Sequence, residues 1–266
     1  MLLGAGGLFL LSLFIIPLVV VLAQSFRSDG GGFTLAHYTA LLRDEQFRFI
    51  YLRTIKIAVI VTVLAVFMAY PASYLLVKLK PSRKAFLTSL VILPLMTSPV
   101  ARTYAWIVVM GRFGIVNETL RVLHLTKEPI QMLYTEGAIA VGLLQLFLPL
   151  MILNLVSALE NVPHEAEEAA MTLGSNRAGA FFRVVVPLSF DGLIMGATLV
   201  FTGSITAFVT PVMLGGTRVL TLATLMRQQA LVLMNWEAAT ALALVMIITT
   251  TVLHTVLRHF RPENQK

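Results

Sequence analysis

Six long apolar runs constrain this chain more than any other feature of its sequence. They cover about residues 2–23, 54–77, 86–110, 137–159, 188–214 and 238–257. A transmembrane helix needs about 20 mostly apolar residues, so each run is long enough to cross a bilayer. Only 12% of the residues are charged, whereas soluble domains carry roughly 25%. The sequence therefore predicts an all-α integral membrane protein with about six transmembrane helices.

The first run also has some features of a secretory signal peptide, because Val21-Leu22-Ala23 resembles a cleavage site. However, no Lys or Arg precedes the run, and it is longer than the usual apolar region of about 7–15 residues. We interpret it as a retained helix. With the polar segment that follows, including a short surface helix at 34–42, it forms a first region, 1–53. A core domain at 54–258 and a polar tail at 259–266 complete the chain.

Charge and composition exclude several other classes of protein. The chain has no cysteine, which excludes disulfides and thiol catalysis. Its net charge of +7 is not arranged in basic runs with interleaved aromatics, so we do not expect nucleic-acid binding. Basic residues in membrane-protein loops instead mark the cytoplasmic side. The densest group follows the second run and comprises Lys78, Lys80, Arg83 and Lys84. This group, together with the segment described below, favours a cytoplasmic amino terminus.

No catalytic constellation stands out in the sequence. There is no P-loop motif, so we expect no ATP hydrolysis by this chain. His164-Glu165 begins a zinc-protease motif, but Glu168 occupies the position of the second histidine. The five histidines are scattered over loops and span ends. We therefore predict no catalytic residue, no metal site and no cofactor in this chain.

The segment between the fourth and fifth runs, about 161–186, predicts two short helices joined by a tight turn. Pro163 suits a first helical position, and Glu165, Glu167 and Glu168 favour the helix amino-terminal end. Gly174 suits a left-handed helix stop, after which Ser175 is expected to cap the second helix. Pro187 then predicts a break before the fifth span. An amphipathic helix on the membrane surface is one interpretation. A short acidic helix is better suited to a groove in a protein than to an anionic leaflet.

The same segment resembles a signature of permeases in ABC importers. Glu168-Ala169-Ala170, with Gly174 after three intervening residues and Val184-Val185-Val186-Pro187 beyond, is similar to their E-A-A-x-x-x-G…I-x-L-P pattern. Val184 and Val186 replace the usual Ile and Leu, and both remain aliphatic. The resemblance implies cytoplasmic coupling helices that dock into an ATPase subunit. The residues that it assigns to coupling are Glu165, Glu168, Ala169, Ala170, Gly174, Arg177 and Pro187.

Further stretches resemble the spermidine/putrescine branch of these permeases. They are Ser98 to Trp106, Gly111 to Asn117, Phe208 to Gly216, and the pairs Asn235-Trp236 and Ala238-Ala239. The resemblance covers about 38–257 and implies a type I ABC importer permease fold in the bacterial inner membrane. It implies as partners a second, different permease, two ATPase subunits that hold ATP and Mg, and an extracytoplasmic substrate-binding protein. The implied solute is polyamine-like or another small polar organic compound.

A solute pathway needs polar groups inside the spans, because such groups usually face a cavity or another helix. The candidates are Arg102, Tyr104, Trp106, Gln145, Asn154, Ser204, Thr206 and Thr210. The spans contain no deep acidic residue, and Arg102 would repel a polyamine unless it is paired. Either the binding protein selects the solute, or the solute is an anion or zwitterion. Gly192, Gly196 and Gly203 share one face of the fifth span and favour close helix packing over solute contact.

Two other functional classes remain as alternatives. A secondary transporter or channel subunit driven by an ion gradient would need ionisable residues at the midplane and internal repeats, and neither is evident in the sequence. A membrane-embedded enzyme would need a catalytic constellation, which is missing. The importer permease is therefore the leading interpretation.

Overall fold

A computed structural model describes residues 7, 9, 11–26, 32, 34 and 36–259. This part of the chain consists of helices and the loops that join them, and it contains no strand. Contacts between Cα atoms divide it into two units, one formed by 1–54 and 221–249 and the other by 55–220 and 250–266. The helix α4 (Glu45–Val77) begins in the first unit and continues in the second. The all-α prediction is confirmed.

The first unit contains helices from both ends of the chain. They are η1 (Leu11–Ile15), α2 (Ile16–Gln24), α3 (Ala36–Arg43), the start of α4, α14 (Leu222–Arg227), η4 (Gln228–Val232) and most of α15 (Trp236–His259). Two polar contacts connect them: the hydroxyls of Tyr51 and Thr249 lie 3.1 Å apart, and the buried Thr54 hydroxyl accepts the backbone N–H of Leu222 at 3.0 Å. Thr54 thereby satisfies one of the backbone donors at the amino-terminal end of α14.

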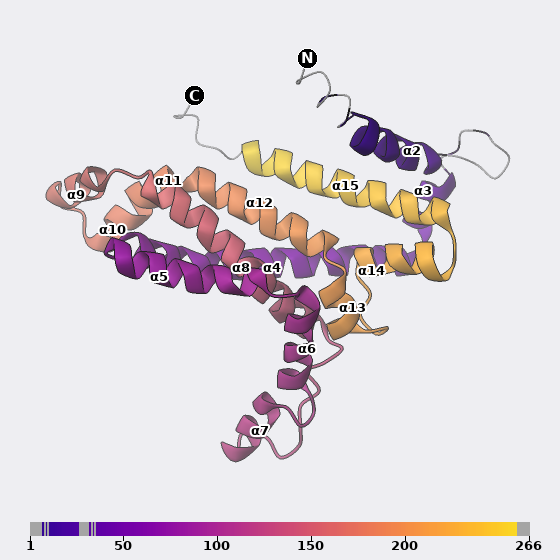
Figure 1. Cartoon of the computed structure of the whole chain (residues 1–266), viewed down its shortest axis with the longest axis horizontal. Coiled ribbons are helices and arrows are strands. Elements are labelled where there is room, and N and C mark those ends of the chain that lie inside the picture. Colours follow the sequence, from indigo (N-terminus) through magenta and orange to yellow (C-terminus); the bar gives the residue numbers. More distant parts are fainter. Residues whose placement is uncertain are drawn as a thin grey trace. The chain divides into compact units, whose positions relative to one another are not determined.

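The second unit holds the rest of the elements. They are α5 (Pro81–Ile92), η2 (Leu93–Met96), α6 (Pro99–Met110), α7 (Ile115–Val122), α8 (Glu136–Glu160), α9 (His164–Thr172), α10 (Arg177–Ala180), η3 (Phe181–Val185), α11 (Val186–Leu188), α12 (Phe190–Thr206) and α13 (Val209–Gly215). Within this unit α12 runs alongside α8 (Figure 1). The short α9 and α10 lie together at one end of that helix pair.

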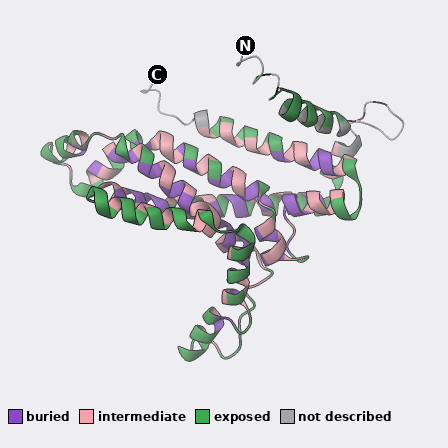
Figure 2. Cartoon of the chain, in the orientation of Figure 1, coloured by how far each residue is buried: buried purple, intermediate pink, exposed green. Residues whose placement is uncertain are grey.

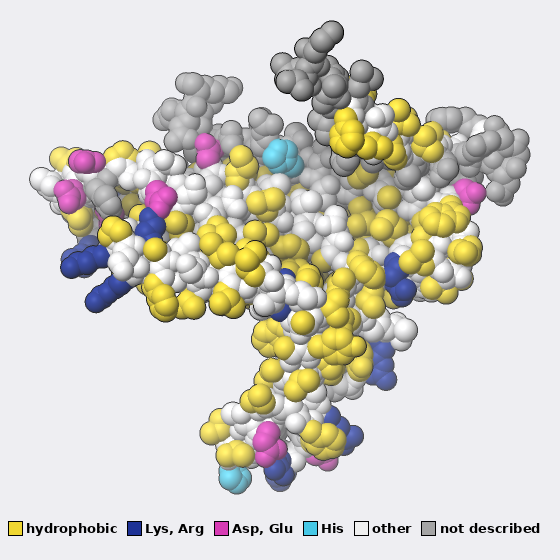
Figure 3. Space-filling model, in the orientation of Figure 1, with side chains coloured by type: hydrophobic (Ala, Val, Ile, Leu, Met, Phe, Trp, Pro, Cys, Tyr) yellow, Lys and Arg dark blue, Asp and Glu magenta, His cyan; other side chains and the backbone are white. Residues whose placement is uncertain are grey.

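The helix α8 is at the centre of the second unit's core. Leu143, Met151 and Leu155 on α8 are fully buried, as are Val200 on α12 and Leu214 on α13 (Figure 2). By contrast, α5 has no buried residue. Hydrophobic side chains nevertheless cover much of its outward face and that of α6 (Figure 3). Apolar side chains on the outer face of a helix are expected where the surrounding solvent is lipid.

Glycines allow α12 to approach α8 closely. A Cβ added at Gly192 would collide with the Cβ of Ala158, one at Gly196 with the sulfur of Met151, and one at Gly203 with the ring of Phe147. All three glycines therefore face α8 of the same chain. The prediction that this face serves packing is confirmed, and the packing partner is an internal helix.

Among the described residues, the three helices α4, α8 and α15 are long and apolar enough to cross a membrane, and two bent pairs raise the number to as many as five. The predicted first span, 2–23, lies partly outside the described residues, and its described part from Leu11 onward is helical. The fold is that of an integral membrane protein.

The predicted third and fifth spans are broken, unlike the continuous helices that their apolar runs suggest. The third bends by 94° between η2 and α6, where Pro94 and Pro99 remove backbone donors and Ser98 is extended. The fifth stops at Ala207, whose backbone is extended, and restarts at Val209. Before it, a 69° bend separates α11 from α12 at Ser189, two residues after Pro187. The predicted break near Pro187 is therefore present but displaced.

Candidate functional site

The predicted coupling segment forms two short helices, as expected from its sequence. Pro163 has an extended backbone and lies one position before α9, where its missing N–H costs no helical hydrogen bond. Glu165 and Glu167 follow in the first turn, where the helix dipole favours negative charge. The sequence predicted Pro163 as the first residue of the helix, whereas the helix begins one residue after it, at His164.

A two-bond turn ends α9 at Gly174. The N–H of Gly174 donates to the carbonyl of Met171, and the N–H of Ser175 donates to that of Ala170, both at 3.0 Å. This is the Schellman pattern, which needs a left-handed residue after the helix. Gly174 supplies it with φ of 96°.

The cap of α10 is Asn176, which corrects the prediction of Ser175. The Oδ1 atom of Asn176 accepts the N–H of Gly179 at 2.7 Å. Ser175 is unavailable for this role because its backbone completes the Schellman turn. The turn is therefore one residue longer than the sequence suggested.

Most of the predicted coupling residues are exposed to solvent. Glu165, Glu168, Ala169, Gly174, Arg177 and Pro187 are exposed, and Ala170 is half-buried. Within the described part of the chain, neither Glu165 nor Glu168 forms an ion pair. The two carboxylates are three residues apart, so they project from neighbouring positions on one side of α9. Acidic side chains gather at the α9 end of the second unit, and basic ones lie near the start of α5 (Figure 3).

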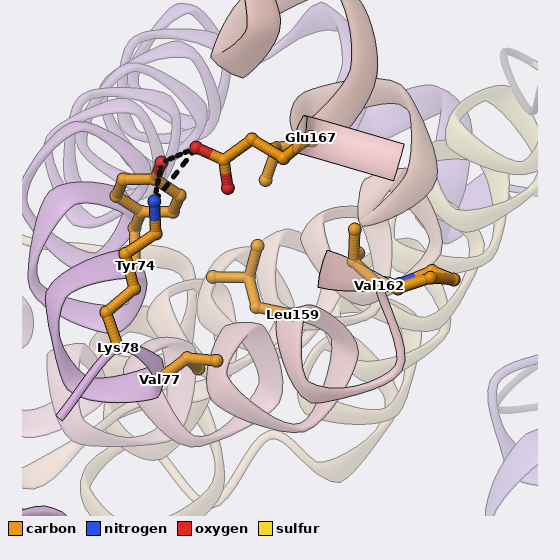
Figure 4. A pocket seen from close by; sticks show the side chains of 8 residues that line it. Tyr74, Val77, Lys78, Leu159, Val162 and Glu167 are labelled. Carbon is orange, nitrogen blue, oxygen red and sulfur yellow. Dashed lines mark hydrogen bonds and ion pairs between the residues drawn. The ribbon is translucent and has the colours of Figure 1, made fainter. Parts of the chain in front are cut away.

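Glu167 differs from its acidic neighbours because it is buried and points into the protein. Its Oε1 atom accepts hydrogen bonds from the hydroxyl of Tyr74 at 2.5 Å and from Nζ of Lys78 at 2.8 Å (Figure 4). Lys78 also donates to the Tyr74 hydroxyl and lies 4.0 Å from the centre of its ring. These three side chains, Tyr74, Lys78 and Glu167, are called the α4–α9 cluster below.

Electrostatics in the α4–α9 cluster favour the ion pair. Desolvation alone would lower the pKa of Lys78, but the hydrogen bonds to Glu167 and Tyr74 and the charge of Glu167 raise it above its ordinary value of 10.5. A cavity of about 20 Å³ lies beside the cluster, lined also by Val77, Leu159 and Val162 (Figure 4). Its volume suits one water molecule, so it is too small for a solute.

This internal role of Glu167 was not predicted from the sequence. The only local signal was the spacing of Tyr74 and Lys78, which are four residues apart and so share a helix face. Nothing in the sequence indicates that α9 folds back onto that face.

The candidate pathway residues of the third span lie on α6. Tyr104 is exposed, and the half-buried Trp106 packs against the core. Arg102 is half-buried, and its Nε and Nη1 atoms are shielded from solvent without a hydrogen-bond partner among the described residues. Buried guanidinium donors ordinarily have partners. Arg102 therefore presents donor groups that the described part of the chain leaves unsatisfied.

The candidates of the later spans are largely bonded within their own helices. Asn154, Ser204 and Thr206 donate to the carbonyls four residues earlier, at 2.7–2.8 Å. Asn154 also lies in the glycine contact between α8 and α12. Gln145 is half-buried on α8. Thr210 on α13 lies 3.4 Å from the hydroxyl of Thr103, which connects α13 to α6. The structure thus joins Thr210 to the helix that carries Arg102, and it places Asn154 at a packing contact.

Comparison with known proteins supports one family. Residues 61–266 match the binding-protein-dependent transport system inner membrane component. The spermidine/putrescine permease PotB of Haemophilus influenzae is 34% identical over 236 residues, which cover 86% of this chain and 82% of that protein. PotB of Escherichia coli K12 is 30% identical, covering 88% and 87%. The E. coli molybdenum permease ModB is 36% identical over 137 residues, covering 51% and 58%.

Solved structures show the same fold. A bacterial alginate ABC transporter in complex with its periplasmic protein has a chain that superposes with a TM-score of 0.82 at 14% identity, covering 99% of this chain and 94% of that one. A second alginate importer structure gives 0.77 at 16% identity, covering 100% and 95%. The matched family and the PotB relatives establish that the chain belongs to the binding-protein-dependent inner membrane components and is a permease subunit of an ABC importer.

Proposed function

We propose that α9 and α10 dock onto a separate ATPase subunit, which binds ATP and Mg and performs the hydrolysis. This proposal rests on a difference in environment among the acidic residues of α9. Glu167 is bonded inside the chain, whereas Glu165 and Glu168 are exposed and unpaired within the described part. A carboxylate pair held on a short, capped helix is suited to charge-assisted hydrogen bonds with a basic groove.

The proposed assembly contains two permeases, two ATPases and an extracytoplasmic binding protein. The second permease is a different chain, and this chain forms half of the solute pathway. The assembly lies in a bacterial inner membrane, which this chain crosses several times, with α9 and α10 on the cytoplasmic side. The basic residues Lys80, Arg83 and Lys84 beside the start of α5 support that orientation.

We propose a polyamine-like solute, on the strength of the two PotB relatives. A polyamine carries several positive charges, so the unpaired donors of Arg102 oppose tight binding next to α6. Selection therefore rests with the binding protein, and the pathway holds the solute weakly. Weak binding within the membrane suits a transporter, because the solute must also leave.

Copurification is the first test. The tagged chain is extracted gently from its native membrane, and the proteins that accompany it are identified by mass spectrometry. We expect an ATPase, a second permease and a binding protein. A chain that is isolated alone, or as a homo-oligomer without an ATPase even after mild crosslinking, contradicts the proposal and favours an ion-gradient-driven transporter.

A pair of matched variants tests whether α9 is the docking surface. The double variant Glu165→Ala/Glu168→Ala is expected to lose the ATPase during purification. Glu128→Ala removes an exposed carboxylate from a different loop and should retain it. Equal ATPase recovery from both variants argues against docking through α9.

The solute is tested on the binding protein that copurifies. Calorimetric titration with spermidine, putrescine, an amino acid and an oxyanion separates the solute classes. We expect binding of the polyamines. Binding of the oxyanion alone overturns the polyamine proposal and makes Arg102 an attractive rather than a repulsive group for the solute.

A further inference from the structure

One short stretch of α4 contacts the coupling segment at several points. Tyr70 and Tyr74 lie one helical turn apart on α4, and both contact the region around the coupling helices. Tyr74 belongs to the α4–α9 cluster, where it donates to Glu167. Tyr70 bonds with the hydroxyl of the buried Ser189, at the bend between α11 and α12.

The ring of Phe181 connects the two tyrosines. Its centroid lies 5.4 Å from that of Tyr70 and 4.9 Å from that of Tyr74, and both pairs pack edge to face. This geometry is the favoured one for aromatic pairs. Phe181 begins η3, directly after α10. The coupling segment therefore reaches Tyr74 twice, through Glu167 and through Phe181, and it reaches Tyr70 through Phe181.

The bonds to Glu167 are directional, unlike the apolar contacts around them. Both donors converge on a single carboxylate oxygen, and the Glu167 side chain is only 11% exposed. An amide oxygen of the same shape would still accept hydrogen bonds, but it would lack the negative charge that attracts the lysine. A displacement of α9 therefore moves α4 unless these bonds break.

We infer that the α4–α9 cluster transmits movement of the docked α9 to α4, and through Phe181 and Tyr70 to the bend that precedes α12. Glu167 is then a positioning residue for coupling, distinct in role from Glu165 and Glu168, which face the ATPase. This inference rests on the proposed docking of α9. It predicts that loss of the cluster separates ATP hydrolysis from transport without separating the subunits.

The experiment uses the complete importer, reconstituted in proteoliposomes with its binding protein. Three quantities are measured: ATPase recovery on purification, the rate of ATP hydrolysis, and solute transported per ATP hydrolysed. The variants are Glu167→Gln, Tyr74→Phe and the charge exchange Lys78→Glu/Glu167→Lys. Lys80→Met is the matched control, because it removes an exposed lysine two residues from Lys78.

Glu167→Gln should keep the ATPase bound and hydrolysis active, while solute transported per ATP falls about tenfold, the effect of losing one charge-assisted bond. Solute transported per ATP should fall less in Tyr74→Phe, because the hydrogen bond from Lys78 to Glu167 remains. The charge exchange should recover part of the transport per ATP that Glu167→Gln loses. Lys80→Met should transport as much solute per ATP as the wild type.

Three outcomes overturn the inference. Normal transport per ATP in Glu167→Gln shows that the cluster does not transmit movement. Loss of the ATPase from that variant shows that Glu167 serves docking or folding. If the charge exchange recovers no transport per ATP, the ion pair between Lys78 and Glu167 does not transmit the movement. Absence of an ATPase from the wild-type preparation instead removes the proposed docking itself, so the two failures are distinguishable.

Discussion

At Gly174 the structure constrains a backbone angle and leaves the space around the residue open. A Cβ added there would meet no atom within 4 Å, but φ is 96°, which side chains of L residues rarely adopt. The turn between α9 and α10 therefore excludes other residues through strain alone. Strain of this kind costs about 1–2 kcal/mol.

Substitutions at Gly174 should reduce transport in a fixed order. We expect Gly174→Asn to have the mildest effect, because Asn tolerates left-handed angles, and Gly174→Ala and Gly174→Asp to uncouple transport by weakening the turn by about 1–2 kcal/mol. All three chains should remain in the membrane. Solute uptake, normalised to membrane abundance, measures the effect. Gly137→Ala, where the new Cβ would make an ordinary contact of 3.7 Å, is the control. Normal uptake by Gly174→Asp contradicts the prediction.

Asn176 and Ser175 offer a second comparison between adjacent residues. Asn176→Ala should destabilise α10 by about 1 kcal/mol through loss of its cap, whereas Ser175→Ala should have little effect. Hydrogen exchange at the amide of Gly179, which Asn176 caps, should accelerate about fivefold in Asn176→Ala only. Equal exchange rates in the two variants would contradict the assignment of the cap.

Sequence alone identified Gly174 but not Glu167, and the difference has a physical reason. A helix stop is a local event, and a glycine after an alanine-rich helix indicates it directly. The role of Glu167 depends on Lys78 and Tyr74, which are 89 and 93 residues away. Three acids in four positions, Glu165, Glu167 and Glu168, look alike until the packing of α9 is known.

At the scale of elements, hydropathy located the spans but not their breaks. The apolar runs located α8 and α15 closely, because a continuous run and a continuous helix coincide there. The helix α4 ends with its run but begins at Glu45, well before the run starts at 54. The third run contains Pro94 and Pro99, which the sequence also permits in a merely kinked helix. The segment between the third and fourth apolar runs, 111–136, contains α7, an eight-residue helix that hydropathy does not indicate.

Two glycines of α12 should differ in their tolerance of alanine. At Gly192 a Cβ would meet the Cβ of Ala158 and the backbone oxygen of Asn154, neither of which can rotate away. At Gly196 it would meet the sulfur of Met151, the flexible part of a side chain. We expect Gly192→Ala to destabilise the subunit by about 1–3 kcal/mol and Gly196→Ala by less. Thermal unfolding in detergent measures both, and the reverse order would show that the contact is not rigid.

The α4–α9 cluster gives the attachment of α9 a defined pH dependence. The pKa of Lys78 is raised in the folded protein, so its contribution to stability is complete below the ordinary value of 10.5 and is lost as the pH rises through the raised value. Because 41% of the Lys78 side chain is exposed, solvent screening limits that contribution to about 0.5–1 kcal/mol.

Thermal unfolding of wild type and Lys78→Met tests this dependence. The difference between their midpoints should be constant at neutral and mildly alkaline pH, and it should close only above about pH 10.5. Closure already near pH 8 would show that the lysine is not stabilised by Glu167. Lys80→Met again serves as the control.

At the scale of the whole molecule, the family match covers nearly all of the second unit. Residues 61–266 carry the family pattern, and the second unit carries the coupling segment, the glycine contact and the candidate pathway residues. The all-α membrane fold followed from the apolar runs, because backbone groups in lipid must be satisfied within each segment. The broken spans and the closing of Glu167 onto α4 depend on tertiary packing, which those runs do not encode.

The glycine face of α12 has a mechanical consequence. Contacts at Gly192, Gly196 and Gly203 hold α12 against α8 over most of its length. The whole helix has 17 residues and is about 25 Å long. Bending α12 would require it to separate from α8, so a rotation applied at one end reaches the other with its full amplitude. We therefore expect deformation at the non-helical residues on either side, Ser189 and Ala207. We therefore expect α8 and α12 to move together as one rigid body, with α12 joined to its neighbours at Ser189 and Ala207.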